Sequence, residues 1–239
     1  MQKPKKSLSQ NFITDRNICK KILTLTKINN KIVLEIGPGY GFMTDLILQQ
    51  RPKKLILIEK DVHLVKYLKN KYKEINNILI IEKDILKFKI DKYKNLIIIS
   101  NLPYNVSSKI ILHLFSFNKN ILEMIFMIQK EVALKFDYNL TKMNKYKFMT
   151  KIVSSYSRFF DVSPKVFFPK PKVISSVVKF KMKNENINFY KANMFSKLIF
   201  KNVRKKISNN VQIKNNYDLL NKRVNELSIN DLLNVYNSF

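Results

Sequence analysis

The chain has 239 residues and 46% hydrophobic content, which excludes wholesale disorder, and no apolar run approaches the ~20 residues of a membrane helix. The basic N-terminus lacks the apolar stretch of a secretory signal. Because Cys19 is the only cysteine, an internal disulfide is excluded, and one Cys with two separated His gives no metal-site spacing. From these absences we expect a cytoplasmic, metal-free protein. With 45 Lys and Arg against 17 Asp and Glu, the formal net charge is +28, which predicts a polyanionic partner.

Short apolar runs alternate with helical patterns over the first 130 residues. After a polar basic arm, the spacing of Ile18, Ile22 and Leu25 predicts a helix that Thr14 or Asp15 can cap. Buried strands are predicted at 31–36, 55–58, 78–81, 96–100 and 121–128, with helices at 42–50, 63–72 and 108–115. This alternation favours an α/β, Rossmann-like domain with a mainly parallel sheet covered on both faces.

The pattern changes near the C-terminus. Residues 173–180 resemble late sheet strands, and 183–188 form a polar linker. Short helices are predicted beyond it, at 192–200, 217–220 and 229–235. We therefore expect a sheet domain over 1–182 and a small helical C-terminal domain over 183–239.

The glycines of the chain are confined to one loop. Gly37, Gly39 and Gly41 are the only three, whereas ~7% usage would give about 17 in a chain of this length. They follow a predicted strand and open a helix, where backbone can pass close to a ligand at the carboxyl edge of a sheet. The third glycine comes one residue too early for the G-x-G-x-x-G of dinucleotide sites, which weakens the case for a pyrophosphate.

Acidic residues follow the next two predicted strands. Glu59, about twenty residues after the glycines, can accept hydrogen bonds from two ribose hydroxyls. Asp84 can accept a hydrogen bond from an adenine amino group. Solvated strand-end charges are the alternative, but acids are scarce in this chain, and two at successive strand ends favour a nucleoside site.

The fourth predicted strand runs into Asn101-Leu102-Pro103-Tyr104, the most specific motif of the chain. An adenine amine is a poor nucleophile because its lone pair is delocalised into the ring. The Asn101 side-chain carbonyl and the Leu102 backbone carbonyl can accept from that amine and favour a pyramidal nitrogen facing a methyl donor. Tyr104 can stack on the base, and Pro103 fixes the turn. A plain Asn-Pro turn is the alternative, against which the glycines and acids argue.

In this order the motifs resemble the S-adenosylmethionine-dependent rRNA adenine N6,N6-dimethyltransferases. The resemblance also rests on 10–12 (Gln-Asn-Phe), 35–39 (Glu-Ile-Gly-Pro-Gly) and 167–173 (Phe-Phe-Pro-Lys-Pro-Lys-Val), and covers about residues 8–210. It implies a class I methyltransferase fold with S-adenosylmethionine as cofactor. The cofactor contacts that it implies are Asn11, Ile13, Gly37, Gly39, Glu59, Asp84 and Asn101.

The resemblance also implies how the site is closed. Residues 1–13 would form a flexible arm over the methionine end of the cofactor. Phe167 would face Tyr104 across a target adenine flipped out of its RNA. Core packing beside Phe168 is the alternative for Phe167.

Two branches of this family compete. KsgA-type enzymes dimethylate two adjacent adenines in the 3′-terminal helix loop of small-subunit rRNA during ribosome assembly. Erm-type enzymes modify one adenine of large-subunit rRNA and confer macrolide resistance. Gly-Pro-Gly, Leu102 and the segment 127–132 favour the first branch, whereas the short length, 9–14 and 169–172 favour the second. We expect the first, acting as a monomer on rRNA of the small subunit or its precursor.

Basic residues outside the motifs predict the RNA contacts. These are Lys170 and Lys172 beside Phe167, and Lys201, Arg204, Lys205 and Lys206 in a segment that resembles a basic helix of the family. A solvated cationic surface is the alternative, and AT-rich codon usage would also raise the lysine content.

Two further classes stay open. One is a non-catalytic assembly or transcription factor on the same fold, against which the intact site motifs argue. The other is a DNA adenine methyltransferase, whose tetrapeptide usually carries two prolines where this chain has Leu102 and Pro103.

Overall fold

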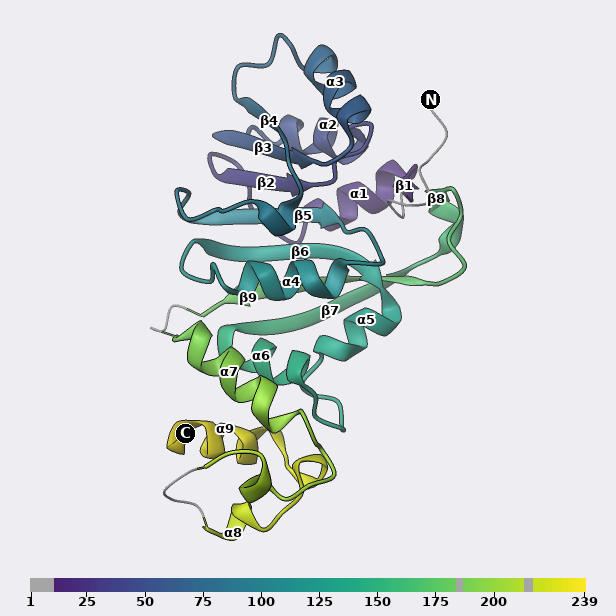
Figure 1. Cartoon of the computed structure of the whole chain (residues 1–239). Helices are drawn as coiled ribbons and strands as arrows, with labels where there is room; N and C mark the ends of the chain where they lie inside the picture. The colour runs from purple at the N-terminus through teal and green to yellow at the C-terminus, as the bar shows by residue number, and fades with distance from the viewer. Residues whose placement is uncertain (1–10, 184–186, 213–216) are drawn as a thin grey trace. The chain divides into compact units, whose positions relative to one another are not determined.

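The computed structural model describes residues 11–183, 187–212 and 217–239 (Figure 1). Residues 1–10 of the predicted arm and part of the predicted linker lie outside the described residues. By its internal contacts the described chain divides into a first unit, residues 11–133 and 157–182, and a second unit made of the remaining residues.

Among the described residues, seven strands form one sheet in the order β4-β3-β2-β5-β6-β9-β7. The strands are β2 (Ile32–Ile36), β3 (Lys54–Glu59), β4 (Ile78–Glu82), β5 (Leu96–Asn101), β6 (Ile121–Gln129), β7 (Ser154–Val162) and β9 (Ser175–Met182). β4, β3, β2, β5 and β6 pair in parallel, and β9 runs antiparallel to β6. The predicted mainly parallel, Rossmann-like sheet is confirmed.

Helices alternate with these strands, and Figure 1 shows α4 lying across one face of the sheet. The α-helices are α1 (Arg16–Leu23), α2 (Phe42–Gln49), α3 (Val62–Lys71), α4 (Ser107–Phe115), α5 (Lys130–Phe136), α6 (Lys145–Val153), α7 (Phe189–Ile199), α8 (Tyr217–Leu220) and α9 (Ile229–Ser238). Short 3-10 helices are η2 (Ile85–Lys87), η3 (Pro164–Val166), η4 (Ile207–Asn209) and η5 (Val224–Glu226). Of the two predicted caps for α1, Asp15 is the one used: its carboxylate accepts from the N–H groups of Asn17 and Ile18.

The central strands form where the sequence has continuous apolar runs. Residues 55–58 of β3 and 96–99 of β5 are all nearly or fully buried, as expected for parallel strands covered on both faces. β7 at the sheet edge differs, because most of its residues between Ser155 and Asp161 are exposed or half-buried. That strand therefore lacks an apolar run, which explains why the sequence did not predict it.

A separate pair of short strands joins the N-terminal segment to residues near 167. β1 (Phe12–Ile13) pairs antiparallel with β8 (Phe167–Phe168), so that Ile13 lies opposite Phe167 and Phe12 opposite Phe168. Thr14 adds two hydrogen bonds, from its N–H and its hydroxyl, to the carbonyl of Val166 at 2.9 and 3.1 Å. The N-terminal segment is thus anchored from residue 12 onward.

The second unit is helical and has an aromatic core. The ring of Phe148 in α6 lies 5.2 Å from that of Phe195 in α7 and 5.6 Å from that of Tyr236 in α9. Residues 134–156 belong to this unit by their contacts, whereas the sequence pattern places them in the sheet domain over 1–182. The predicted helices at 192–200, 217–220 and 229–235 match α7, α8 and α9 within a few residues. None of the helices in the described segments is long and apolar enough to cross a bilayer.

Candidate active site

A cavity of about 290 Å³ lies at the carboxyl ends of β2, β3, β4 and β5, the edge where open parallel sheets bind ligands. The predicted site residues that line it are Asn11, Ile13, Gly37, Gly39, Glu59, Asp84, Asn101, Leu102, Pro103 and Tyr104. Parallel strands deliver their ends to one edge, so residues spread over almost a hundred positions meet there.

The glycine loop brings backbone to the wall of this cavity. Gly37 and Gly39 have φ angles of +62° and +58°, a region that L-residues with a side chain rarely adopt. An added Cβ at Gly37 would meet no atom within 4 Å, so a side chain there would extend into open space. At Gly39 the same atom would lie 2.7 Å from the ring of Phe12. The loop therefore leaves room for a ligand and also seats the N-terminal segment.

Glu59 ends β3 with its carboxylate buried and already bonded. Its Oε1 accepts from the N–H groups of Lys60 and Asp61 at 2.8 and 2.9 Å, and its Oε2 accepts from Gly39 at a longer 3.4 Å. Burial raises the pKa of Glu59, and these hydrogen bonds offset part of that rise. The weakly bonded Oε2 is the oxygen best able to accept from a ligand hydroxyl.

Asp84 lies after β4 and is more accessible. Its Oδ2 pairs with Nζ of Lys60 at 2.8 Å, and its Oδ1 accepts from the N–H of Leu86 at 3.0 Å. Burial opposes ionisation, but the hydrogen bonds from Lys60 and Leu86 outweigh it and lower the pKa of Asp84. Asp84 is therefore an anionic acceptor on the cavity wall, and its partner Lys60 has a side chain that is 60% exposed.

At the end of β5, the side-chain NH2 group of Asn101 makes a hydrogen bond, whereas its side-chain oxygen makes none among the described residues. Its Nδ2 donates to the carbonyl of Asn11 at 2.7 Å, whereas its buried Oδ1 has no hydrogen-bond partner within the described residues. Backbone contacts fix this turn: the Leu102 N–H donates to Met127 at 3.1 Å. A buried acceptor without a donor is costly, and Asn101 is one of the residues that line the cavity.

Tyr104 is held by a residue that the sequence analysis did not single out. The Tyr104 hydroxyl and the Ser175 hydroxyl lie 2.6 Å apart, and Ser175 in β9 is fully buried. Burial raises the pKa of Tyr104, so the phenol stays neutral. The ring is thereby fixed at the cavity wall by its far end.

Phe167 does not reach the cavity, contrary to the prediction that it faces Tyr104. Its side chain is 4% exposed and belongs to the apolar core that includes Ile13. Phe168 lines the cavity instead and is 57% exposed. Successive residues of a strand point to opposite sides, and the pairing of β1 with β8 buries Phe167.

Glu35 is a further buried acid on the cavity wall, which the sequence analysis quoted only as part of the glycine-loop motif. It is 3% exposed, and its Oε2 accepts from the Thr44 hydroxyl at 2.6 Å. Burial raises the pKa of Glu35 to about 8. The available signal was an acid at the next-to-last position of an otherwise apolar strand.

The predicted RNA contacts fall on both units. Lys170 and Lys172 are exposed in the segment after β8, and no ion pair holds either within the described chain. The second unit carries the exposed residues Lys201, Arg204, Lys205 and Lys206. This second group is not helical as expected, because α7 ends at Ile199 and the following residues form turns. Within the described residues no three His, Cys, Asp or Glu side chains form a metal-binding group.

Comparison with known proteins adds a family to this geometry: the model of the ribosomal RNA adenine dimethylase family matches residues 1–239. The chain belongs to this family. Its members are S-adenosylmethionine-dependent methyltransferases.

Curated relatives in the family are similar over most of their length. The chain is 36% identical to the ribosomal RNA small subunit methyltransferase A of Hydrogenobaculum, with 100% of the chain and 94% of the relative covered. It is 38% identical to the protein of the same name from Mycoplasma mobile, with 90% and 85% covered. The Malacoplasma penetrans relative is 39% identical, with 87% and 77% covered.

Solved structures of the family share the fold. A dimethyladenosine transferase from Plasmodium falciparum has a TM-score of 0.78 at 24% identity and covers 93% of this chain and 94% of its own. The 23S rRNA methyltransferase ErmE has a TM-score of 0.74 at 20% identity, with 95% and 98% covered. At these identities the likeness supports the fold alone.

Proposed function

We propose that this protein dimethylates N6 of two adjacent adenines in the 3′-terminal helix loop of small-subunit rRNA, with S-adenosylmethionine as methyl donor. It would act as a monomer in the cytoplasm, on the small ribosomal subunit or its precursor. One observation carries the chemistry: the buried Oδ1 of Asn101 has no donor among the described residues, and Asn101 lines the same cavity as Glu59 and Asp84. The small-subunit target is supported by the names of the curated relatives.

The residues present fit S-adenosylmethionine. The open space at Gly37 admits the ligand, the Oε2 of Glu59 can accept from a ribose hydroxyl, and Asp84 can accept from the adenine amine. Glu35, which lines the same cavity, becomes anionic as pH rises through about 8 and then suits a cationic ligand. Asn11 and Ile13 line the cavity from the N-terminal segment, so we assign them to closing it over the methionine end.

The acceptor chemistry follows from the tetrapeptide. When bound, S-adenosylmethionine supplies an electrophilic methyl group on a sulfonium. Asn101 Oδ1 accepts a hydrogen bond from the target amine, and the Leu102 carbonyl is the second acceptor that we assign. These two bonds draw the N–H bonds away from the ring plane, so that the nitrogen lone pair localises and faces the methyl group. Tyr104 stacks on the base, and Pro103 holds the turn that carries these groups.

The Erm-type alternative has less support. The curated relatives quoted above carry small-subunit names at 36–39% identity, whereas ErmE is similar in fold at 20% identity. A non-catalytic factor would have no use for the Oδ1 of Asn101, which has no donor among the described residues, because leaving such a group buried costs ~1–3 kcal/mol.

The deciding experiment is tritiated methyl transfer to undermethylated small subunits and, in parallel, to large-subunit rRNA. We expect label in the small subunit alone, mapped to two adjacent adenines in the 3′-terminal helix loop. Label in the large subunit would identify the Erm-type activity. Binding to small subunits without label in either would identify a non-catalytic factor.

A further inference from the structure

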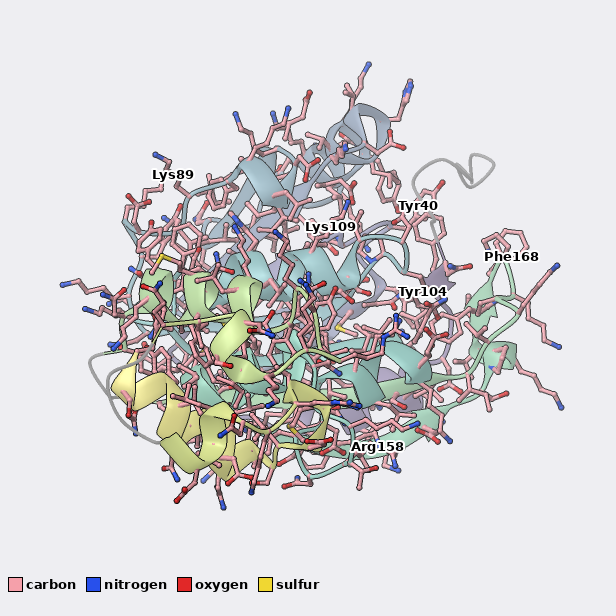
Figure 2. All side chains as sticks on the ribbon, turned by 60° about the horizontal axis from the view of Figure 1, so that its bottom comes forward. Tyr40, Lys89, Tyr104, Lys109, Arg158 and Phe168 are labelled. Atoms are coloured by element: carbon pink, nitrogen blue, oxygen red, sulfur yellow. The ribbon has the colours of Figure 1, made fainter. Side chains whose placement is uncertain are left out.

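An exposed aromatic ring stands at the rim of the cavity, and no role has been assigned to it above. Phe168 is 57% exposed and lines the cavity together with Tyr104. Figure 2 shows Phe168 at the margin of the ribbon, on the side where Tyr40 and Tyr104 also lie. Its neighbour Phe167 is buried in the core and fixes β8 in place. The backbone position of Phe168 is therefore set by the pairing of β8 with β1.

The chain around Phe168 carries apolar and cationic side chains and no acid. Residues 163–174 read Ser-Pro-Lys-Val-Phe-Phe-Pro-Lys-Pro-Lys-Val-Ile. Val173 and Ile174 are 41% and 46% exposed, and Lys170 and Lys172 are exposed between these residues and Phe168. Exposed apolar groups interleaved with lysines match the two parts of a nucleotide, a base and its phosphate.

When the target adenine is extruded, the neighbouring base loses a stacking partner, and residues 168–174 offer an exposed aromatic ring that can replace it. A base that is flipped out no longer stacks on its neighbours, and unstacking costs a few kcal/mol. Tyr104 is tied to Ser175 at the cavity wall, where it is placed for the target. Phe168 is far more exposed and borders the opening, so it is placed for the base that stays outside.

We propose that Phe168 stacks on the nucleotide adjacent to the target adenine, and that Lys170 and Lys172 bind the phosphates flanking it. The proposal rests on the proposed function, because it takes single-stranded loop RNA as the substrate. Residues 168–172 would then form a subsite for the flanking nucleotide, separate from Asn101 and Tyr104, which act on the target adenine.

The first test compares Phe168→Ala with Phe159→Ala on undermethylated small subunits. Phe159 in β7 is a matched control, since it is 46% exposed and does not line the cavity. We expect Phe168→Ala to lower kcat/KM for the subunit about tenfold, the loss of one base–aromatic stack, with an unchanged Kd for S-adenosylmethionine. Phe168→Trp should keep the activity, and Phe159→Ala should have no effect. A fully active Phe168→Ala enzyme would overturn the proposal.

The second test locates the contact. The photoreactive residue p-benzoylphenylalanine is placed at 168 or, as a control, at 159, and is crosslinked to undermethylated small subunits. Primer extension should map the crosslink from 168 to the nucleotide next to the methylated adenine. A crosslink to the target adenine itself, or to rRNA outside that loop, would overturn the proposal. If the wild-type chain fails to methylate small subunits at all, the proposed function fails first, and the two failures are distinguishable.

Discussion

The polar groups at the two ends of the cavity differ in whether they already have hydrogen-bond partners. At the end formed by residues of β2, β3 and β4, the acidic side chains already accept hydrogen bonds: Glu59 from three backbone N–H groups, Asp84 from Lys60, and Glu35 from Thr44. At the other end, the Asn101 Oδ1 lacks a partner within the described residues, and Phe168 is more than half exposed. The first end is organised without a ligand, whereas the second is completed by one.

This difference predicts that changes at one end alter the affinity for the cofactor and that changes at the other end alter the rate of methyl transfer. A ligand at the carboxylate end gains bonds to groups whose positions are fixed in advance, so changes there should weaken binding of the cofactor. At the amide end the protein leaves an acceptor for the reacting amine, so changes there should slow methyl transfer and leave cofactor binding intact. The following variants test that separation.

Asn101→Ala should give the largest effect. It removes the acceptor for the target amine, and we expect methyl transfer to fall more than ~100-fold, as when one preorganised group at a reacting centre is lost. Binding of S-adenosylmethionine, followed by calorimetry, should remain measurable and fall far less than methyl transfer, the loss of the Nδ2 bond to Asn11 being its only direct cost. Asn101→Asp is the matched control: it keeps acceptor oxygens but loses the donor to Asn11, so it should be intermediate. Wild-type product levels from Asn101→Ala would refute the amine contact.

Tyr104→Ala should lower kcat/KM for the rRNA substrate by ~10- to 100-fold through loss of base stacking. Tyr104→Phe and Ser175→Ala each remove the same hydroxyl–hydroxyl bond, so each should cost only a few-fold, and the double variant should be no worse than either single one. Additive losses in this cycle would show that Ser175 acts other than through Tyr104. A loss confined to rRNA affinity, with kcat unchanged, would contradict the stacking role.

Glu59→Gln should act on the opposite end. We expect the Kd for S-adenosylmethionine to rise by about tenfold, the usual worth of a hydrogen bond to a charged acceptor, while kcat at saturating cofactor changes little. The exposed Glu74, 84% accessible at its side chain, provides the control Glu74→Gln, which should have no effect. A fall in kcat with unchanged cofactor affinity would break the comparison between the two ends.

Glu35 gives the smallest expected effect, a dependence on pH. Because its pKa is raised to about 8, Glu35 is mostly protonated at neutral pH and gains charge as pH rises. Binding of cationic S-adenosylmethionine should therefore strengthen a few-fold from about pH 7 to about pH 9, more than that of S-adenosylhomocysteine, which lacks the sulfonium. Glu35→Gln should remove this difference. If the two ligands change equally in the wild type, Glu35 does not face the cationic centre.

The same group affects stability with a defined sign. The folded-state pKa of Glu35, about 8, lies above its ordinary value of 4.5, so the unfolded chain releases this proton first. The free energy of unfolding should therefore decline as pH rises between these two values. Urea unfolding across this range should show the decline in the wild type and a smaller one in Glu35→Gln. An equal decline in both would assign it to other groups.

Many of the strands of the first unit can be predicted from the local hydrophobic pattern of the sequence. Strands such as β3 carry uninterrupted apolar runs because both faces of a parallel sheet are buried, so the sequence predicts them well. The ends of parallel strands meet at one edge, and Glu59, Asp84 and Asn101 were therefore predictable as neighbours. β7 and α6 escaped prediction because an exposed edge strand and a helix of mixed polarity lack such runs.

The sequence alone determined the chemical groups of the site and their order along the chain. Only the tertiary structure decided which of two adjacent aromatics reaches the cavity. That choice depends on the pairing of β1 with β8, more than 150 residues apart, and a shift of one residue would exchange Phe167 and Phe168. Burial by distant segments also leaves the Oδ1 of Asn101 without a donor among the described residues and raises the pKa of Glu35. No local sequence pattern contains that burial.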